Sequence, residues 1–147
     1  MREKNNVWIS VQAKQAFDGV EQDAIELVTE GRLQKSTEGV TLRYLESEVT
    51  GMEGTTTTIQ VEGPRVTLLR QGQFNSQMVF EAGRRHLALY ETPYGALEVG
   101  VNTKRMCQEL TSEGGKLEID YHLEIDHKVA GFNQFRVTVT PRSAISQ

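Results

Sequence analysis

Three short segments joined by very short turns place the strongest constraint on how this chain folds. They cover residues 40–48, 55–61 and 65–72, and they are rich in the β-branched and aromatic residues that strands favour. The turn signals between them, at residues 50–54 and 62–64, are too short for any connection except an antiparallel one. The sequence therefore predicts a three-stranded antiparallel meander.

Alternation along these strands carries two charged residues toward the interior. Glu46 continues the face that ends in Tyr44 on the first strand, and Arg70 continues the face of Val66 and Leu68 on the third. Strands lie about 4.8 Å apart, so two long side chains can bridge a gap of about 10 Å between these two strands. Because an inward arginine is costly without a counter-charge, we predict a salt bridge between Arg70 and Glu46.

The composition is that of a globular protein: 147 residues, 37% hydrophobic and 24% charged, which suits one domain over residues 1–147 with an irregular tail after about residue 141. The net charge of −4 argues against nucleic acid as the principal partner. No apolar run reaches membrane-spanning length, and no signal-peptide core precedes the first strand. With a single cysteine, Cys107, these features predict a cytoplasmic protein without a membrane partner.

The rest of the chain shows the same alternation of apolar and polar residues. Further strands are predicted over residues 7–14, 25–35, 77–80, 85–92, 96–104, 117–125 and 135–139. Gly31 interrupts the second of these and predicts a bulge or a bend at a barrel corner. A helix over residues 21–30 is the competing interpretation, which β-branched residues and Gly31 disfavour. Residues 105–114, with Met106 and Leu110 four apart, predict the single helical turn.

The fold class follows from the number and spacing of these segments. Eight to ten short strands without helical crossovers predict an all-β sandwich or barrel, and the short turns favour up-and-down order. Closure into a single antiparallel barrel is favoured because it removes the exposed edges that an open meander leaves.

Scattered residues across the chain carry a resemblance to a known family. They include the segment from Val40 to Glu46, Arg70-Gln71-Gly72, Tyr94-Gly95, Thr103-Lys104 and Gly115-Lys116-Leu117. Over residues 25–125 the chain resembles the YwiB-like family, a bacterial family of small uncharacterised proteins. The resemblance implies a lipocalin-like, calycin-type β-barrel, and it implies no established activity.

The inward polar residues form the candidate binding site. They are Tyr44, Glu46, Arg70, Tyr90, Thr103 and Tyr121. In one interpretation Arg70 and Glu46 are a structural tie inside a barrel that its own side chains fill. In the other, Arg70 holds the carboxylate or phosphate of a small ligand in a cavity lined by the tyrosines.

Metal binding and cysteine chemistry find little support in the residue spacing. His86, His122 and His127 lack zinc-ligand spacing, and residues on alternate positions of one strand, such as Asp120 and His122, stand about 7 Å apart. We expect no metal and no cofactor. Cys107 has no histidine at a recognisable offset, and we expect an inert, half-buried thiol.

Two other local features have ordinary explanations. The threonine run at residues 55–58 is interpreted as a strand preference for β-branched residues. The basic cluster at residues 84–86 is interpreted as solvated turn charge, with a contact to an anionic protein or RNA as a minor alternative.

Two functional hypotheses follow. The first is a non-enzymatic barrel that binds a small, partly apolar ligand with an anionic group, because Arg70 lies among tyrosines and aliphatic residues. The alternative is a filled barrel that acts as a protein-interaction or accessory module through residues near Arg84 and Arg85 or through an edge strand. An enzyme ranks third, because no nucleophile–base or acid–base pair has a suitable spacing.

Overall fold

The computed structural model describes residues 5–17, 20–21, 24–73, 75–92, 95–125 and 128–142. Eleven strands run along this part of the chain, together with one 3-10 turn. The strands are β1 (Val7–Phe17), β2 (Val20–Glu21), β3 (Ile25–Ser36), β4 (Gly39–Leu45), β5 (Thr55–Glu62), β6 (Arg65–Gly72), β7 (Ser76–Phe80), β8 (Arg85–Thr92), β9 (Gly95–Gln108), β10 (Gly115–Ile125) and β11 (Lys128–Pro141). The 3-10 turn, η1, is Glu48–Thr50. The predicted irregular tail and His127 lie outside the described residues.

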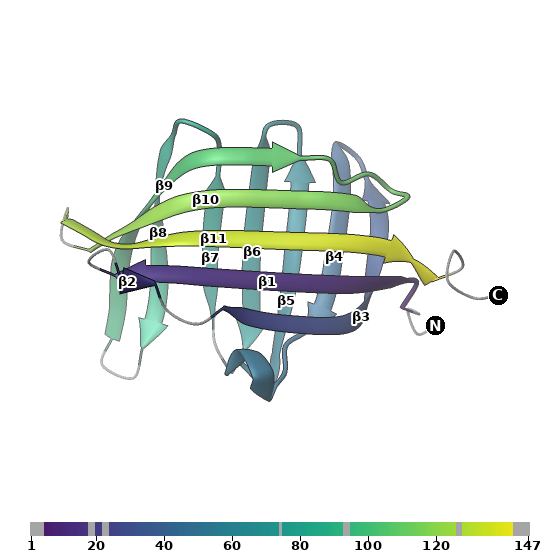
Figure 1. Ribbon diagram of the computed structural model, residues 1–147, viewed down its shortest axis with the longest axis horizontal. Helices are drawn as coiled ribbons and strands as arrows, with labels where there is room; N and C mark the ends of the chain where they lie inside the picture. Colours follow the sequence, from purple (N-terminus) through teal and green to yellow (C-terminus); the bar gives the residue numbers. More distant parts are fainter. Residues whose placement is uncertain are drawn as a thin grey trace.

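The strands form a barrel in up-and-down order, as the sequence predicts. From β3 to β11 each strand pairs with the next one along the chain, β1 pairs with β3, and β11 returns to pair with β1. The two-residue β2 only extends β1. In Figure 1 strands β9, β10, β11, β1 and β3 run across the front, while β4 to β8 run crosswise behind them. The interior of the barrel lies between these two layers.

Gly31 marks a corner of the barrel, as predicted. Residues 25–31 of β3 pair with β1, whereas residues 31–36 pair with β4, so the strand changes partner at Gly31. A Cβ atom on this residue would collide with the side chain of Ile9 and would lie 2.7 Å from the carbonyl oxygen of Arg43. The strand can bend here because glycine lets the two neighbouring strands approach closely. The competing helix over residues 21–30 is wrong.

The prediction of a helical turn over residues 105–114 is wrong. Residues Arg105–Gln108 continue β9 and pair with Leu117–Asp120 of β10. The pairing shifts at Lys104, because Thr103 faces Tyr121 whereas Arg105 faces Asp120. Such a bulge puts two residues of one strand opposite one residue of its partner, and it moves the inward face from odd to even positions. Met106 and Leu110 are four residues apart, a spacing that places two side chains on one side of an extended chain as well as on one face of a helix, and Leu110 lies beyond the end of β9.

The helical turn lies instead between β4 and β5. Strand β4 ends at Leu45, three residues before the predicted end, and η1 follows over Glu48–Thr50. The hydroxyl of Ser47 accepts a hydrogen bond from the Val49 amide, and Gly51 closes the turn in the left-handed conformation at φ 75°. Figure 1 shows η1 at the lower end of the barrel.

The barrel interior divides into two halves. The largest fully buried apolar side chains are Phe80, Ile9, Leu42, Ile59, Leu117, Ile119, Val66, Val101 and Val137. We call the region that they occupy the filled half. The other half lies beneath η1 and carries polar side chains. In the described part of the chain, no helix is long and apolar enough to cross a membrane.

Candidate functional site

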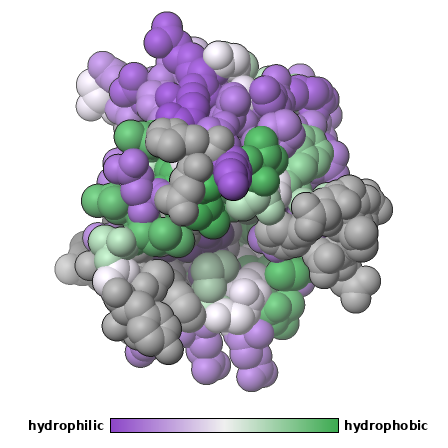
Figure 2. All heavy atoms as spheres, turned by 90° about the vertical axis from the view of Figure 1, so that its left-hand side faces the viewer, coloured by the Kyte–Doolittle hydropathy of each residue, from purple (hydrophilic) through white to green (hydrophobic). Residues whose placement is uncertain are grey.

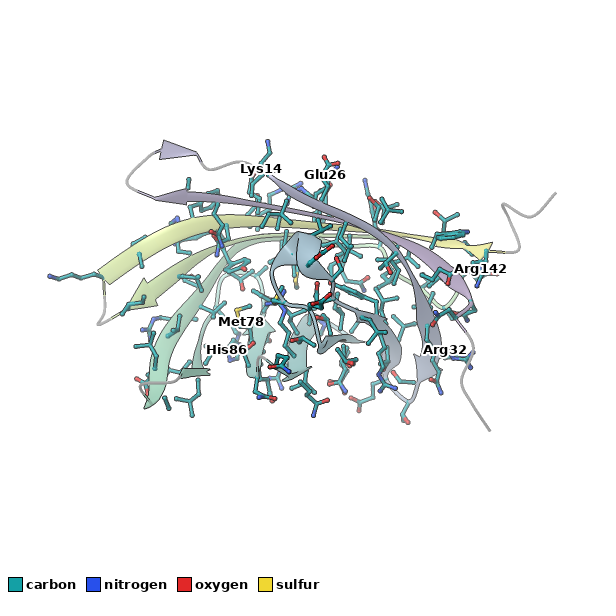
Figure 3. All side chains as sticks on the ribbon, turned by 90° about the horizontal axis from the view of Figure 1, so that it is seen from below. Lys14, Glu26, Arg32, Met78, His86 and Arg142 are labelled. Atoms are coloured by element: carbon teal, nitrogen blue, oxygen red, sulfur yellow. The ribbon has the colours of Figure 1, made fainter. Side chains whose placement is uncertain are left out.

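A cavity of about 240 Å³ occupies the half of the barrel next to η1, which we call the hollow half. Its walls come from strands on both layers and from the η1 loop. The lining residues are Val11, Ala13, Gln15, Ile25, Leu27, Tyr44, Glu46, Thr50, Met52, Leu68, Arg70, Met78, Tyr121, Leu123, Asn133 and Phe135. Figure 3 looks into the barrel from below, with η1 in front of the space between the layers and Met78 lying between them.

The Glu46 carboxylate is the most strongly held group of the cavity. Its side chain is only 2% exposed. Thr50 Oγ1 donates a hydrogen bond to Oε1 at 2.9 Å, and Thr57 Oγ1 donates one to Oε2. Tyr44 also hydrogen-bonds to this carboxylate. Three hydroxyl groups therefore compensate Glu46 for the loss of water.

Tyr44 is held in its protonated form. Burial raises the pKa of its phenol far above the ordinary value of 10.0, and the nearby negative charge of Glu46 raises the pKa further. The charge of Arg70 acts in the opposite direction and is the weaker effect. Tyr44 thus remains a hydrogen-bond donor at every physiological pH.

Arg70 is paired by charge rather than by a hydrogen bond. Its Nε lies 3.9 Å from Glu46 Oε2, so the predicted ion pair is present. That distance is too long for a hydrogen bond, and the buried Nε finds no hydrogen-bond partner among the described residues. The Oδ1 atom of Asn133, in the same cavity, is also buried without a partner from the described ranges. The cavity therefore presents both a cationic donor and a neutral acceptor.

The structure brings four of the six predicted site residues to the cavity: Tyr44, Glu46, Arg70 and Tyr121. The Tyr121 ring packs on Phe80 with 4.8 Å between ring centroids. Thr103 is buried, but it does not line the cavity, because it lies just before the bulge on β9 and its backbone is bonded to the turn at Gly83 and Arg84. The backbone of Tyr90 pairs with Ser76, and its side chain lies outside the described residues.

The sequence analysis missed several polar residues of the site, among them Thr57, Thr50 and Asn133. Thr57 belongs to the threonine run that was interpreted as a strand preference, yet it binds Glu46. Its inward parity, shared with Ile59 on the same strand, could have revealed it. Thr50 lies in η1, outside any strand, so alternation does not predict the direction of its side chain. Asn133 lies two residues before Phe135 on β11, so the parity of that strand also predicts an inward side chain.

The basic cluster at residues 84–86 is engaged by carboxylates. Arg85 pairs with Glu124 at 2.7 Å, and the hydrogen bond from Arg85 lowers the pKa of Glu124. His86 contacts Glu81 at 2.9 Å, and Arg84 lies 3.9 Å from the same glutamate.

The outer face of β10 is likewise committed to ion pairs. Asp120 binds Arg136 at 2.8 Å and lies 3.6 Å from Arg105. The ring of His122 packs edge-on against Phe132. No group of three His, Cys, Asp or Glu side chains in the described ranges is arranged to hold a metal ion. Cys107 is half-buried in β9, opposite Glu118.

Comparisons with known proteins agree with this architecture. A family model described as "Domain of unknown function (DUF1934)" matches residues 9–137. The uncharacterized β-barrel protein YwiB of Bacillus subtilis (strain 168) is 25% identical over 138 residues, which cover 94% of this chain and 95% of YwiB. The crystal structure of YwiB is similar with a TM-score of 0.81 at 23% identity, over 93% of this chain and 92% of that chain, and it shows the same fold. The match over residues 9–137 shows that the chain belongs to the DUF1934 family.

Proposed function

We propose that the hollow half of the barrel binds a small, partly apolar ligand that carries one anionic group. The observation that supports the proposal is Arg70, whose buried Nε has no hydrogen-bond partner in the described part of the chain and which faces a cavity. A carboxylate or phosphate oxygen would supply the acceptor that Glu46 does not provide at 3.9 Å.

The size and lining of the cavity define the ligand class. At about 240 Å³ the cavity lies just below the range of about 300–1,000 Å³ that is usual for sites of drug-sized ligands. Leu27, Leu68, Met78 and Phe135 supply the apolar part of the lining. A short-chain or single-ring acid fits this combination, with its acid group on Arg70 and its apolar part among the aliphatic side chains.

The proposal is one of binding rather than catalysis. Both oxygens of Glu46 accept hydrogen bonds from threonine hydroxyls, so this carboxylate is not offered to a substrate as a base. The calycin-type barrel that the family resemblance implies would add support at the level of fold analogy alone. We expect the protein to act in the cytoplasm, where a single cysteine such as Cys107 stays reduced.

The test is thermal unfolding in the presence of hexanoate and of phenylacetate, with hexanol as the uncharged control. A ligand that binds only the folded state at 100 times its Kd stabilises it by about 2.7 kcal/mol, which is a measurable rise in Tm. We expect both acids to raise the Tm of the wild type and neither to raise that of Arg70→Gln. Arg65→Gln, which changes an exposed arginine on the same strand, is the matched control. Equal shifts in wild type and Arg70→Gln contradict the proposal.

A second candidate function, a protein-interaction module, is favoured by one observation on β8. The pairing of β7 with β8 consists of the single pair Ser76 and Tyr90 among the described residues, so the sheet is thinly joined there. Leu87 and Leu89 on β8 are 57% and 60% exposed. Figure 2 shows hydrophobic side chains gathered across the middle of the end of the barrel that lies on the left in Figure 1.

A double variant, Leu87→Ser with Leu89→Ser, distinguishes the two candidate functions. An interaction module loses its partner in this double variant, whereas the response to hexanoate stays as in the wild type. A ligand-binding barrel loses the hexanoate response only when Arg70 is changed.

A further inference from the structure

A second hollow lies outside the barrel, at the corner where β3 leaves β1 and joins β4. It is a groove of about 550 Å³. Its walls include Trp8 of β1, Arg32 of β3 and Arg43 of β4, together with Leu45 and Thr56. These residues project from the outer face of the sheet, away from the cavity proposed above.

The two arginines face each other across neighbouring strands. In the register of β3 with β4, Arg32 is directly opposite Arg43. Side chains in such a position start from Cβ atoms about 4.5–5.5 Å apart, and two like charges placed this way destabilise a sheet. The same arrangement lets two guanidinium groups contact one oxyanion, with planar donors that match carboxylate and phosphate oxygens.

An aromatic wall stands beside this arginine pair. Trp8 pairs with Glu30 on β3, which places it diagonal to Arg32 on the outer face, at a spacing of about 7–8 Å. Arg142 lies over the Trp8 ring at 5.3 Å and binds the carboxylate of Glu30 at 3.1 Å. Arg32 and Arg142 lie at the same end of the molecule in Figure 3.

The charges of the groove differ from those of the whole chain. The described lining carries two arginines, Arg32 and Arg43, and one carboxylate, Glu30, which Arg142 binds at 3.1 Å. Arginine side chains gathered in one groove are a local feature that attracts anions, although the whole chain has a net charge of −4.

We propose that this groove binds a small compound in which a phosphate or carboxylate group is attached to a ring. The oxyanion lies between Arg32 and Arg43, and the ring packs toward Trp8 and Leu45. The groove shares one lining residue, Tyr44, with the cavity that contains Arg70. Its arginines are different ones, and the proposal does not require that cavity to bind anything.

Trp8 makes the proposal directly testable, because it is the only tryptophan in the sequence. Its fluorescence reports the groove and not the barrel interior. The probes are phenyl phosphate and benzoate, which separate the two sources of the oxyanion, with benzyl alcohol as the uncharged ring. We expect a saturable change in Trp8 emission with one or both oxyanions at concentrations up to about 10 mM, weakened by added NaCl, and none with benzyl alcohol.

Two variants and one control locate the binding. Arg32→Gln and Arg43→Gln should each raise the Kd by about tenfold or more, because each removes a charge-assisted contact. Arg65→Gln, which changes an exposed arginine outside the groove, should leave the Kd unchanged, and the far-UV circular dichroism of every variant establishes that it is folded. If a variant does not fold, the dependence of the wild-type Kd on NaCl and on the charge of the probe decides instead.

Several results would overturn the proposal. They are the absence of a saturable Trp8 response to either oxyanion, an equal response to benzyl alcohol, and a Kd that is unchanged in folded Arg32→Gln and Arg43→Gln. A response to a hexaglutamate peptide without a response to either small oxyanion would assign the groove to an acidic protein segment and would also overturn it.

Discussion

In both the filled half and the hollow half of the barrel, side chains alternate between the inside and the outside. The inward side chains fill the space in one half and leave a cavity in the other. In the filled half, inward positions carry branched aliphatic residues such as Ile9, Leu42 and Ile59, each with no exposed surface. In the hollow half, the inward positions next to Leu42 and Ile59 carry Tyr44 and Thr57, and Glu46 follows Tyr44 just beyond the end of β4. The first set fills the space between the layers, and the second leaves about 240 Å³ empty.

The contrast shows how a barrel keeps a cavity without losing its shape. Apolar side chains interdigitate because nothing fixes their position except packing. Buried polar side chains stay where their hydrogen bonds hold them, and Glu46 is held by two threonine hydroxyls and a tyrosine. The hydrogen bonds of Glu46 therefore fix the position of this polar side chain at the edge of the cavity.

The largest effect on stability is expected when a buried leucine is replaced by alanine, and each half of the barrel offers one leucine for this test. Leu42→Ala should lower the free energy of unfolding by about 3–5 kcal/mol, because it opens a void in the filled half. Leu68→Ala should cost about 2 kcal/mol, since its side chain borders existing space and has fewer contacts to lose. Urea unfolding of both variants measures the difference, and equal losses would mean that the two halves are packed alike.

The next largest effect is the difference in stability loss between variants of the two members of the ion pair, Glu46 and Arg70. Glu46→Ala should cost about 2–4 kcal/mol, because it removes the acceptor of three hydroxyl groups and the counter-charge of Arg70. Arg70→Gln should cost less than about 1 kcal/mol, because Arg70 makes no hydrogen bond to Glu46. Chemical denaturation at pH 7 gives both values. A larger loss in Arg70→Gln would show that the pair is a structural tie.

A smaller effect is expected at high pH, from Tyr44. Its pKa is raised in the folded state above the ordinary 10.0 of the unfolded chain, so the folded protein keeps a proton that the unfolded chain releases. The stability from this group is complete below about pH 10 and falls as the pH rises above it, by at most about 1.4 kcal/mol per pH unit.

The control for this prediction is Tyr44→Phe, which has no phenol to titrate. Unfolding of both proteins at pH 8, 10 and 11 should show that the wild type loses its advantage over the variant as the pH increases. If the difference in unfolding free energy between the two proteins stays constant with pH, the surroundings in the hollow half do not raise the pKa of Tyr44.

The smallest effect is expected at the mouth of the cavity. Thr50→Val should cost about 1 kcal/mol, because it removes the hydrogen bond from the η1 loop to Glu46. Thr56→Val, on the outer face of β5, is the matched control and should change stability by less than about 0.5 kcal/mol. If amide exchange in the η1 loop is equally slow in both variants, the loop is not held by Glu46.

Most of the fold could be predicted, because alternation is a local property. The strands at residues 65–72 and 85–92 were predicted with the bounds of β6 and β8. Glu46 and Arg70 were predicted to lie inside and to pair, since their positions follow from counting along two regular strands. Thr103 was also predicted to face inward and is buried, yet parity could not show that it lies away from the cavity.

The sequence by itself determined which residues look inward, since a strand turns successive side chains to opposite faces whatever surrounds it. The sequence also indicated the bend at Gly31, but only the tertiary structure decided where the parity changes at Lys104 and where the single helical turn lies. These features depend on register between strands that are distant in the chain, and on the closure of β11 against β1. Only the tertiary structure decided the cavity as well, because its volume depends on how inward side chains from many strands pack against each other.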